Sequence, residues 1–221
     1  MMTEQELYAA ADLFQIGGMA LDFPTPSVAE GFADGTLMAD VRSCLEEMGA
    51  ECAAAGSGEE AGAIGEGGET GAVSADALLE ALKEEHSRLF ANMRHPIIWI
   101  YETTFCLPPE EAAGAMLFVS ADCIHVAESM KRAGVELAKG NRQPEDYFPT
   151  ELQFLSYLCN AQAEGKPEVV QAGALVEFVT MHLSRWVLAF LDALMRETTM
   201  EEYRQLACAL AAGYRRLVEP L

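Results

Sequence analysis

The sequence predicts an all-α fold, a helical bundle in two parts joined by a hinge loop. Apolar residues recur every three or four positions along most of the chain, which is the period of an amphipathic helix. No long run alternates apolar and polar residues as a half-buried strand does. One polar stretch interrupts this pattern, because Gly140 and Asn141 are helix-ending residues and Pro144 prevents the helix from continuing. We expect an N-terminal helical part over 1–140, a hinge over 141–148 and a C-terminal helical part over 149–221.

Composition limits the classes of function. Apolar residues make up 51 % of the 221 residues, which indicates a packed core rather than a disordered chain. Lys and Arg number 14 and Asp and Glu number 35, so the formal net charge is 14 − 35 = −21. This charge argues against general nucleic-acid binding, which depends on basic residues that neutralise phosphates. It favours a basic partner, or it serves only to keep the surface solvated.

The six cysteines show neither a CxxC pair nor zinc-ligand spacing. We expect all of them to be reduced thiols, mostly buried on helices as small apolar side chains. The N-terminus lacks a basic-then-apolar leader, and no apolar run reaches membrane-spanning length. The expected location is the cytoplasm, without stable membrane insertion. The cysteines are Cys44, Cys52, Cys106, Cys123, Cys159 and Cys208.

Helix boundaries in the first quarter follow from capping residues. Thr3 and Glu6 have capping-box spacing and open the first helix. Ser27 can cap a short second helix, and a third is expected over 37–48. Residues 49–74 are mostly Gly, Ala and Glu. They bury too little apolar area to offset their ordering entropy, so we expect a mobile acidic loop there.

Two helices and an extended connector are expected between this loop and the hinge. Residues 75–93 form a helical apolar face, and 97–101 are a short apolar run with no second strand to pair with. We interpret that run as a buried connector. Pro108 opens the next helix, whose apolar face continues to Leu137.

Three helices are expected after the hinge. Asp146 can cap the helix that runs through Leu158, and Pro149 falls in its first turn. A wide apolar stripe predicts one long helix over 176–194. Thr199 is expected to cap the last helix.

Several blocks carry a family resemblance. They are LYAAADLFQ followed by FPTPS near the N-terminus, LKEEHSRLF at 82–90, YETTF at 101–105, PEDYF at 144–148, and FVTMHLSRWVLAFLDAL at 178–194 with Glu202-Tyr203-Arg204 after it. No single block is specific. In this order they resemble the TorD/DmsD family, cytoplasmic chaperones for molybdoenzymes exported by the twin-arginine route.

The resemblance implies a TorD-like all-α fold and a peptide ligand. The ligand would be the twin-arginine signal peptide of a molybdenum- or tungsten-type oxidoreductase subunit, which the chaperone holds in the cytoplasm until its cofactor is inserted. Tyr147 stands where the family usually has His, and it does not gain or lose a proton near neutral pH as His can. The family's peptide site corresponds here to Leu89, Phe90, Tyr101, Thr103, Phe105, Asp146 and Tyr147.

Physical complementarity points to the same partner. Two guanidinium groups beside an apolar stretch would be matched by an apolar groove rimmed with carboxylates, which bind Arg bidentately. Asp146 is the leading candidate, and its alternative role is that of a simple helix cap. The predicted peptide-binding residues are His86, Leu89, Phe90, Trp99, Tyr101, Glu102, Thr103, Phe105, Glu145, Asp146, Tyr147 and Glu151.

Other functions remain open at this point. A chaperone could recognise a molybdoenzyme subunit through a segment other than a twin-arginine signal. A helical-bundle metal carboxylate enzyme needs paired Glu-x-x-His units, and only Asp122-x-x-His125 resembles half of one. No phosphate-binding loop and no catalytic triad is present. We therefore expect no enzyme activity, cofactor or metal, and a monomer or a dimer that swaps 149–221.

Overall fold

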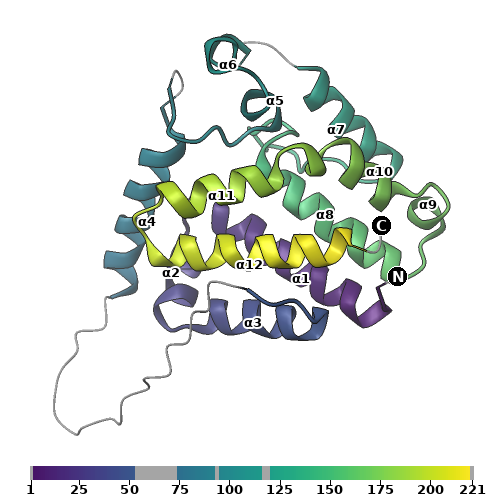
Figure 1. Cartoon of the computed structure of the whole chain (residues 1–221), viewed down its shortest axis with the longest axis horizontal. Coiled ribbons are helices and arrows are strands. Elements are labelled where there is room, and N and C mark those ends of the chain that lie inside the picture. The colour runs from purple at the N-terminus through teal and green to yellow at the C-terminus, as the bar shows by residue number, and fades with distance from the viewer. Residues whose placement is uncertain (1, 53–73, 93–94, 116–119, 220–221) are drawn as a thin grey trace, which may run out of the picture.

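Two long helices, α1 (Glu4–Leu21) and α8 (Phe148–Ala163), make the most extensive contact in the molecule and form its centre. The computed structural model describes residues 2–52, 74–92, 95–115 and 120–219 (Figure 1). The remaining helices of these ranges are α2 (Pro26–Ala33), α3 (Thr36–Met48), α4 (Ala75–Phe90), α5 (Glu102–Phe105), α6 (Pro109–Ala115), α7 (Ala121–Arg132), α9 (Pro167–Val170), α10 (Ala174–Met181), the 3-10 turn η1 (Leu183–Arg185), α11 (Val187–Glu197) and α12 (Glu201–Val218).

The all-α prediction is confirmed. Within the described ranges the backbone forms helices and no strand, and one isolated antiparallel bridge joins Tyr101 to Tyr147. Most of the expected acidic loop, residues 53–73, lies outside the described residues. The expected connector at 97–101 is non-helical, as predicted, and ends at this bridge.

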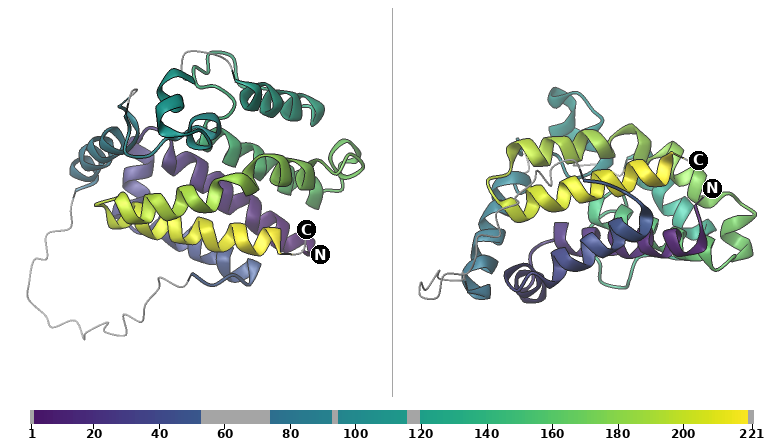
Figure 2. Two further views of the ribbon diagram at one scale, coloured as in Figure 1. Left: turned by 45° about the horizontal axis from the view of Figure 1, so that its top comes forward. Right: turned by 60° about the horizontal axis from the view of Figure 1, so that its bottom comes forward.

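The helices pack in layers around one core. In the right view of Figure 2, α11 and α12 form a layer over α1 and α3. A single cluster of buried apolar side chains includes residues from before and after the hinge segment 141–148, such as Leu13 and Phe14 on α1 and Leu210 on α12. The division into two helical parts therefore stays a prediction.

Glycine permits the close packing of α1 on α8. A Cβ atom added at Gly18 would lie 3.0 Å from the backbone oxygen of Pro149 and 2.9 Å from Cγ of Gln153. A backbone atom in the first turn of α8 cannot move aside without straining the packed helix. The sequence pattern did not reveal this contact, because a glycine inside a helix has no periodic signature.

Gly18→Ala is expected to lower the free energy of unfolding by about 1–2 kcal/mol, since overpacking outweighs the better helix propensity of alanine. Urea denaturation of the purified protein measures this change. Gly114→Ala on α6 is the matched control, because an added Cβ there meets nothing within 4 Å. Equal effects of the two substitutions would contradict the close approach.

Capping explains where several helices begin. The capping box of Thr3 and Glu6 is confirmed by reciprocal side-chain hydrogen bonds. The second helix is capped by Thr25 rather than by Ser27, because Pro26 takes the first helical position and the Thr25 oxygen then faces Val28 N. The last helix has Met200 at its N-cap, so the predicted Thr199 cap is wrong.

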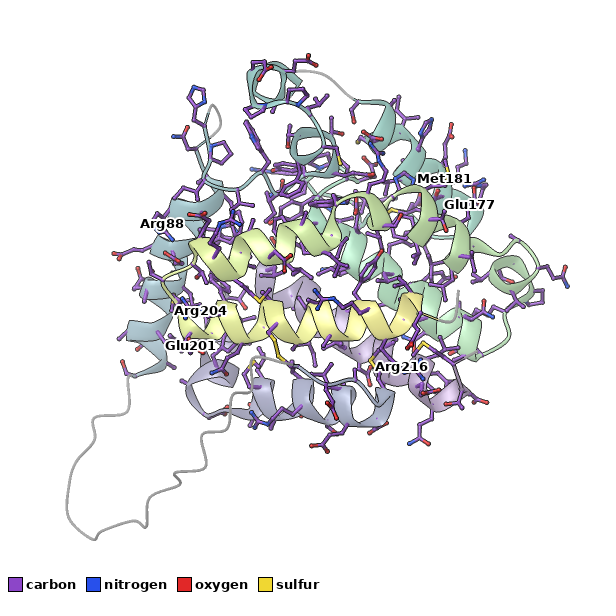
Figure 3. All side chains as sticks on the ribbon, in the orientation of Figure 1. Arg88, Glu177, Met181, Glu201, Arg204 and Arg216 are labelled. Carbon is purple, nitrogen blue, oxygen red and sulfur yellow. A yellow bond between two sulfur atoms is a disulfide. The ribbon has the colours of Figure 1, made fainter. Side chains whose placement is uncertain are left out.

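Glu85 on α4 explains the position of Thr199. Its buried carboxylate accepts hydrogen bonds from Thr199 N at 2.6 Å and from Thr198 Oγ1 at 2.9 Å. Arg88, labelled in Figure 3, pairs with the same carboxylate at 2.7 Å and donates to the carbonyl of Glu197. These bonds, led by that of Arg88, lower the pKa of Glu85 to about 2. The α11–α12 connection is thereby fixed to α4.

Two predicted long helices are interrupted. The helix expected from Pro108 to Leu137 is α6 followed by α7, because Ser120 caps a new helix by accepting from Cys123 N. Met116–Val119 lie outside the described residues, and α7 ends at Arg132. The helix expected over 176–194 is bent by 45° between α10 and α11, at the turn η1.

The prediction of six reduced cysteines is wrong for two of them. Cys52 and Cys208 form a disulfide with a Cα–Cα distance of 6.0 Å, which lies in the usual range for such a bond. They are 156 residues apart in sequence, so spacing gave no signal. Cys44, Cys123 and Cys159 are buried free thiols, as expected, and Cys106 is exposed.

No single described helix is long and apolar enough to cross a membrane. The bent pair Ala174–Arg185 and Val187–Glu197 passes that test by length and composition when taken together.

Candidate functional site

The hinge segment 141–148 docks on the connector and on α5. Glu102 N donates to the carbonyl of Asp146 at 2.9 Å, and Phe148 N donates to the carbonyl of Ile100 at 3.0 Å. Tyr101 OH donates to Gln143 Oε1 at 3.1 Å, and the Tyr101 and Tyr147 rings lie 5.4 Å apart. The YETTF and PEDYF blocks of the sequence are therefore brought together, as the predicted site requires.

Asp146 anchors α5 rather than capping the helix that follows it. Its Oδ2 accepts from Thr103 Oγ1 at 2.6 Å and from Thr103 N at 3.3 Å, and Thr103 Oγ1 also contacts Ser120 Oγ at 2.5 Å. The predicted cap on α8 is wrong, because Tyr147 occupies that N-cap. Burial raises the pKa of Asp146, while the two bonds from Thr103 lower it in part.

Asp146→Ala is expected to lower the free energy of unfolding by about 1–3 kcal/mol, because two buried donors on Thr103 lose their acceptor. Chemical denaturation of Asp146→Ala, Thr103→Val and the double variant forms the cycle that measures this coupling. Glu136→Ala, at an exposed carboxylate, is the control. A loss no larger than the control's would show that the anchor contributes nothing.

The accessible part of this junction lies at the C-terminal end of α1. Asp22, partly exposed, accepts from Tyr147 OH at 3.0 Å and from Phe23 N at 2.7 Å, both through Oδ1. Its Oδ2 makes no hydrogen bond with any described residue. Phe23 is 53 % exposed, and Met19 one turn earlier is 46 % exposed. We call Met19, Asp22, Phe23 and Tyr101 the Asp22 surface.

Aromatic rings connect the Asp22 surface to the core. The Phe23 ring lies edge-on to His86 at 5.5 Å, and His86 lies edge-on to Phe90 at 5.0 Å. Phe90 stacks on Phe190 at 6.2 Å. Burial lowers the pKa of His86, and its Nε2 has no hydrogen-bond partner among the described residues. His86 therefore packs between Phe23 and Phe90 as a neutral ring.

An ionic cluster lies beside the hinge segment, with a buried carboxylate at its centre and with Arg185 and Asp122 reaching the surface. Glu102 is fully buried, with Oε2 2.8 Å from His182 Nδ1 and Oε1 3.0 Å from Arg185 Nη1. Arg185 also pairs with Asp122 at 2.8 Å. The bend between α10 and α11 places His182 and Arg185 on the same carboxylate. We call Glu102, Asp122, Glu151, His182 and Arg185 the Glu102 cluster.

Glu151 is the unpaired member of this cluster. It is fully buried on α8, and no hydrogen bond of normal geometry reaches either of its oxygens or Nε1 of Trp186. Burial raises the pKa of Glu151 well above its ordinary value of 4.5, and the neighbouring charges of Glu102 and Asp146 raise it further. A neutral carboxylic acid is the form that this position favours.

The predicted peptide-binding residues divide by accessibility. Trp99, Tyr101, Phe105 and Glu145 are partly exposed. The idea that Glu102 and Glu151 rim a groove is corrected, because both are fully buried. Asp22, Phe23 and Met19 were missed, although FPTPS was recognised as a block and Asp22 directly precedes it. The buried residues of the predicted set are His86, Leu89, Phe90, Glu102, Thr103, Asp146, Tyr147 and Glu151.

The described part of the chain contains no group of three or more His, Cys, Asp or Glu side chains placed to hold a metal ion. Asp122, half of the metal-ligand pattern considered above, is instead paired with Arg185.

A match to a family model shows to which protein family the chain belongs. The model described as nitrate reductase delta subunit matches residues 35–192, which include the hinge segment and the whole Glu102 cluster. The chain belongs to the nitrate reductase delta subunit family. This family comprises chaperones for the maturation of molybdoenzymes, related to the TorD-like proteins that the sequence blocks resemble. No curated protein and no solved structure matches this delta-family chain.

Proposed function

We propose that this delta-family chaperone binds the N-terminal twin-arginine signal peptide of a molybdopterin oxidoreductase subunit in the cytoplasm. It holds that subunit for cofactor insertion before export. The family supplies the client class, a nitrate-reductase-type molybdoenzyme subunit. The net charge of −21 favours a basic segment and steers its approach.

The Asp22 surface is the observation that carries this proposal. A carboxylate with an unused oxygen lies beside an exposed phenylalanine and an exposed methionine. This arrangement complements a guanidinium group that is followed by apolar residues. The partly exposed Tyr101, Trp99, Phe105 and Glu145 extend the same recognition along the connector and hinge.

Calorimetric titration with the twin-arginine peptide of a molybdoenzyme from the same genome tests the proposal. Asp22→Asn is expected to weaken binding about tenfold or more, since a charge-assisted hydrogen bond contributes about 1.5–3 kcal/mol. Phe23→Ala should weaken it as well, and a Lys-Lys peptide should bind less tightly. Asp12→Asn, at an exposed carboxylate on the same helix, is the matched control and should bind normally.

Equal losses from Asp22→Asn and Asp12→Asn would indicate only general attraction to an acidic protein. The absence of binding to every twin-arginine peptide would reject the signal-peptide assignment. Capture of the client subunit without that peptide would then support recognition through another segment.

Recognition of the client through a segment other than the twin-arginine signal is the second candidate function, and the buried carboxylates favour it. Asp146 is occupied by Thr103, and Glu102 is occupied by His182 and Arg185. If neither carboxylate is released on binding, fewer acidic groups remain for an arginine pair than the sequence suggested. Retained client binding after both arginines are replaced would support this candidate.

A further inference from the structure

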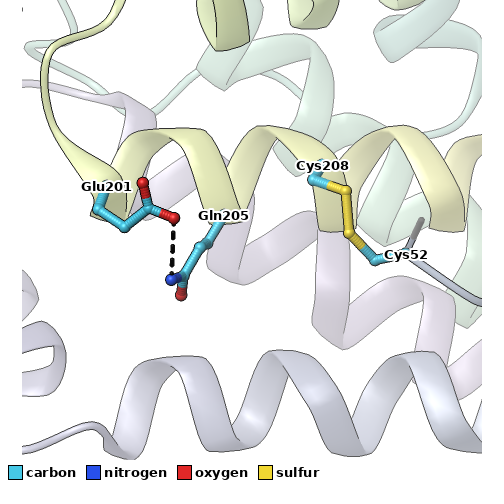
Figure 4. The surroundings of a disulfide bond; sticks show 4 residues. All are labelled: Cys52, Glu201, Gln205 and Cys208. Atoms are coloured by element: carbon cyan, nitrogen blue, oxygen red, sulfur yellow. Dashed lines mark hydrogen bonds between the residues drawn. A yellow bond between two sulfur atoms is a disulfide. The ribbon is translucent and has the colours of Figure 1, made fainter. Parts of the chain in front are cut away.

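The disulfide between Cys52 and Cys208 joins two elements that are distant in sequence. Cys52 follows α3 by four residues, after the left-handed Gly49 that ends the helix, and Cys208 lies in the middle of α12 (Figure 4). The segment between Gly49 and Cys52 is also held by the hydrogen bond from Ala50 N to the carbonyl of Leu45 and by packing of Ala50 against the core. The disulfide is therefore the covalent attachment of this segment to the last helix.

The two cysteines differ in accessibility. Cys208 is 8 % exposed, whereas Cys52 is partly exposed. We therefore expect a thiolate from solution to attack at Cys52, the more exposed residue. Attack at Cys52 makes Cys208 the leaving group.

The surroundings of the disulfide favour its exchange. A pocket of about 380 Å³ between α3 and α12 is lined by both cysteines and by Arg42 and Arg204. A thiolate leaves more readily when cations are close, because they stabilise its negative charge. Arg204 is partly neutralised by Glu201, which also binds Gln205 (Figure 4). Arg42 forms no hydrogen bond or ion pair with any described residue, and its side chain is exposed.

We propose that Cys52–Cys208 is an exchangeable disulfide that reacts with an anionic small thiol of the glutathione class. The two arginines attract the carboxylates of such a thiol to the pocket. This site is separate from the Asp22 surface and does not depend on the proposed function.

The reaction balances as ordinary thiol–disulfide exchange. A thiolate attacks Cys52 Sγ, the Sγ–Sγ bond breaks, and Cys208 leaves as a thiolate that takes a proton from solvent. A second small thiolate then attacks the small thiol's sulfur in the mixed disulfide, that S–S bond breaks, and Cys52 leaves as a thiolate that takes a proton from solvent. The products are one oxidised small disulfide and two protein thiols, so two small thiols are oxidised for each protein disulfide that is reduced. Reduction releases residues 50–52 from α12 and opens the pocket at its Cys52 side.

The experiment follows exchange in the oxidised full-length protein. It is incubated with glutathione under native conditions, quenched, and alkylated, and mass spectrometry counts the labelled thiols at Cys52 and Cys208. We expect a glutathione mixed disulfide on Cys52, complete native reduction, and reoxidation when oxidised glutathione is added. Glutathione should react faster than neutral 2-mercaptoethanol once the rates are corrected for thiol pKa.

Arg42→Gln should slow the glutathione reaction about two- to fivefold and leave the mercaptoethanol reaction less affected. Arg42→Lys should restore most of the rate, and added salt should abolish the difference between the variants. Lys131→Gln, an exposed cation on α7, is the matched control.

A disulfide that resists excess glutathione until the protein is unfolded would be purely structural and would overturn the proposal. So would a mixed disulfide found on Cys208 alone, or equal rates for Arg42→Gln and the wild type with both thiols. A protein whose two cysteines stay reduced in oxidised glutathione would reject it as well.

Discussion

Replacing both Cys52 and Cys208 with serine is expected to lower the free energy of unfolding by about 5 kcal/mol. The disulfide closes a loop between residues 156 apart, and the chain-entropy model assigns about this value to a loop of that length. Urea denaturation of the oxidised protein, the reduced protein and the double variant measures the effect. Since the serine variant mimics the reduced form, these two should unfold at similar urea concentrations.

Cys44→Ser separates this effect from the loss of a buried thiol. Cys44 is also buried near α3 but is free, and burial raises its pKa to about 11. Replacing Cys44 should leave the response of the protein to oxidation and reduction of the disulfide unchanged. A reduced wild type as stable as the oxidised one would show that the disulfide does not constrain the unfolded chain.

Glu151→Gln is expected to stabilise the protein at neutral and alkaline pH. Folding raises the pKa of Glu151 above its ordinary value of 4.5. The stability that the protonated group contributes is therefore fully present below about pH 4.5. That contribution is lost as the pH rises towards the folded-state pKa, because the unfolded chain ionises freely. The gain from glutamine therefore grows as the pH rises from about 4.5 towards the folded-state pKa, by at most about 1.4 kcal/mol per pH unit.

Denaturation of wild type and Glu151→Gln at pH 5, 6, 7 and 8 tests the sign and the slope. Glu102→Gln is the matched control at the other fully buried carboxyl of the cluster. It should destabilise by about 3 kcal/mol or more, because it breaks the pairs with His182 and Arg185. A pH-independent difference between wild type and Glu151→Gln would mean that Glu151 does not bind a proton on folding.

The sequence predicted most helices but fewer of their boundaries. Periodic apolar residues depend only on local geometry, so α3, α4 and α8 lie close to the expected ranges. Caps depend on which side chain reaches a free N–H. Thr25 replaces the predicted Ser27, and Met200 takes the N-cap position predicted for Thr199, whose N–H instead donates to Glu85 on another helix. A hydrogen bond made across the fold has no signal in local spacing.

The candidate site also depends on contacts across the fold that local sequence spacing does not reveal. The resemblance correctly brought YETTF and PEDYF together, as the Tyr101–Tyr147 bridge shows. It did not reveal which side of each block faces solvent. Glu102 and Glu151 were expected at a rim because isolated glutamates are usually exposed, yet both lie in the interior. The partners of Glu102, His182 and Arg185, are 80 or more residues away in sequence.

The packing of α1 has a consequence for synthesis on the ribosome. Its apolar face packs mainly against α8, then against α3, and to a smaller extent against α12. Because α8 lies far later in the sequence than α1 and α3, those two helices can cover only part of that face on their own. The largest contact of α1 therefore forms only after α8 has been synthesised.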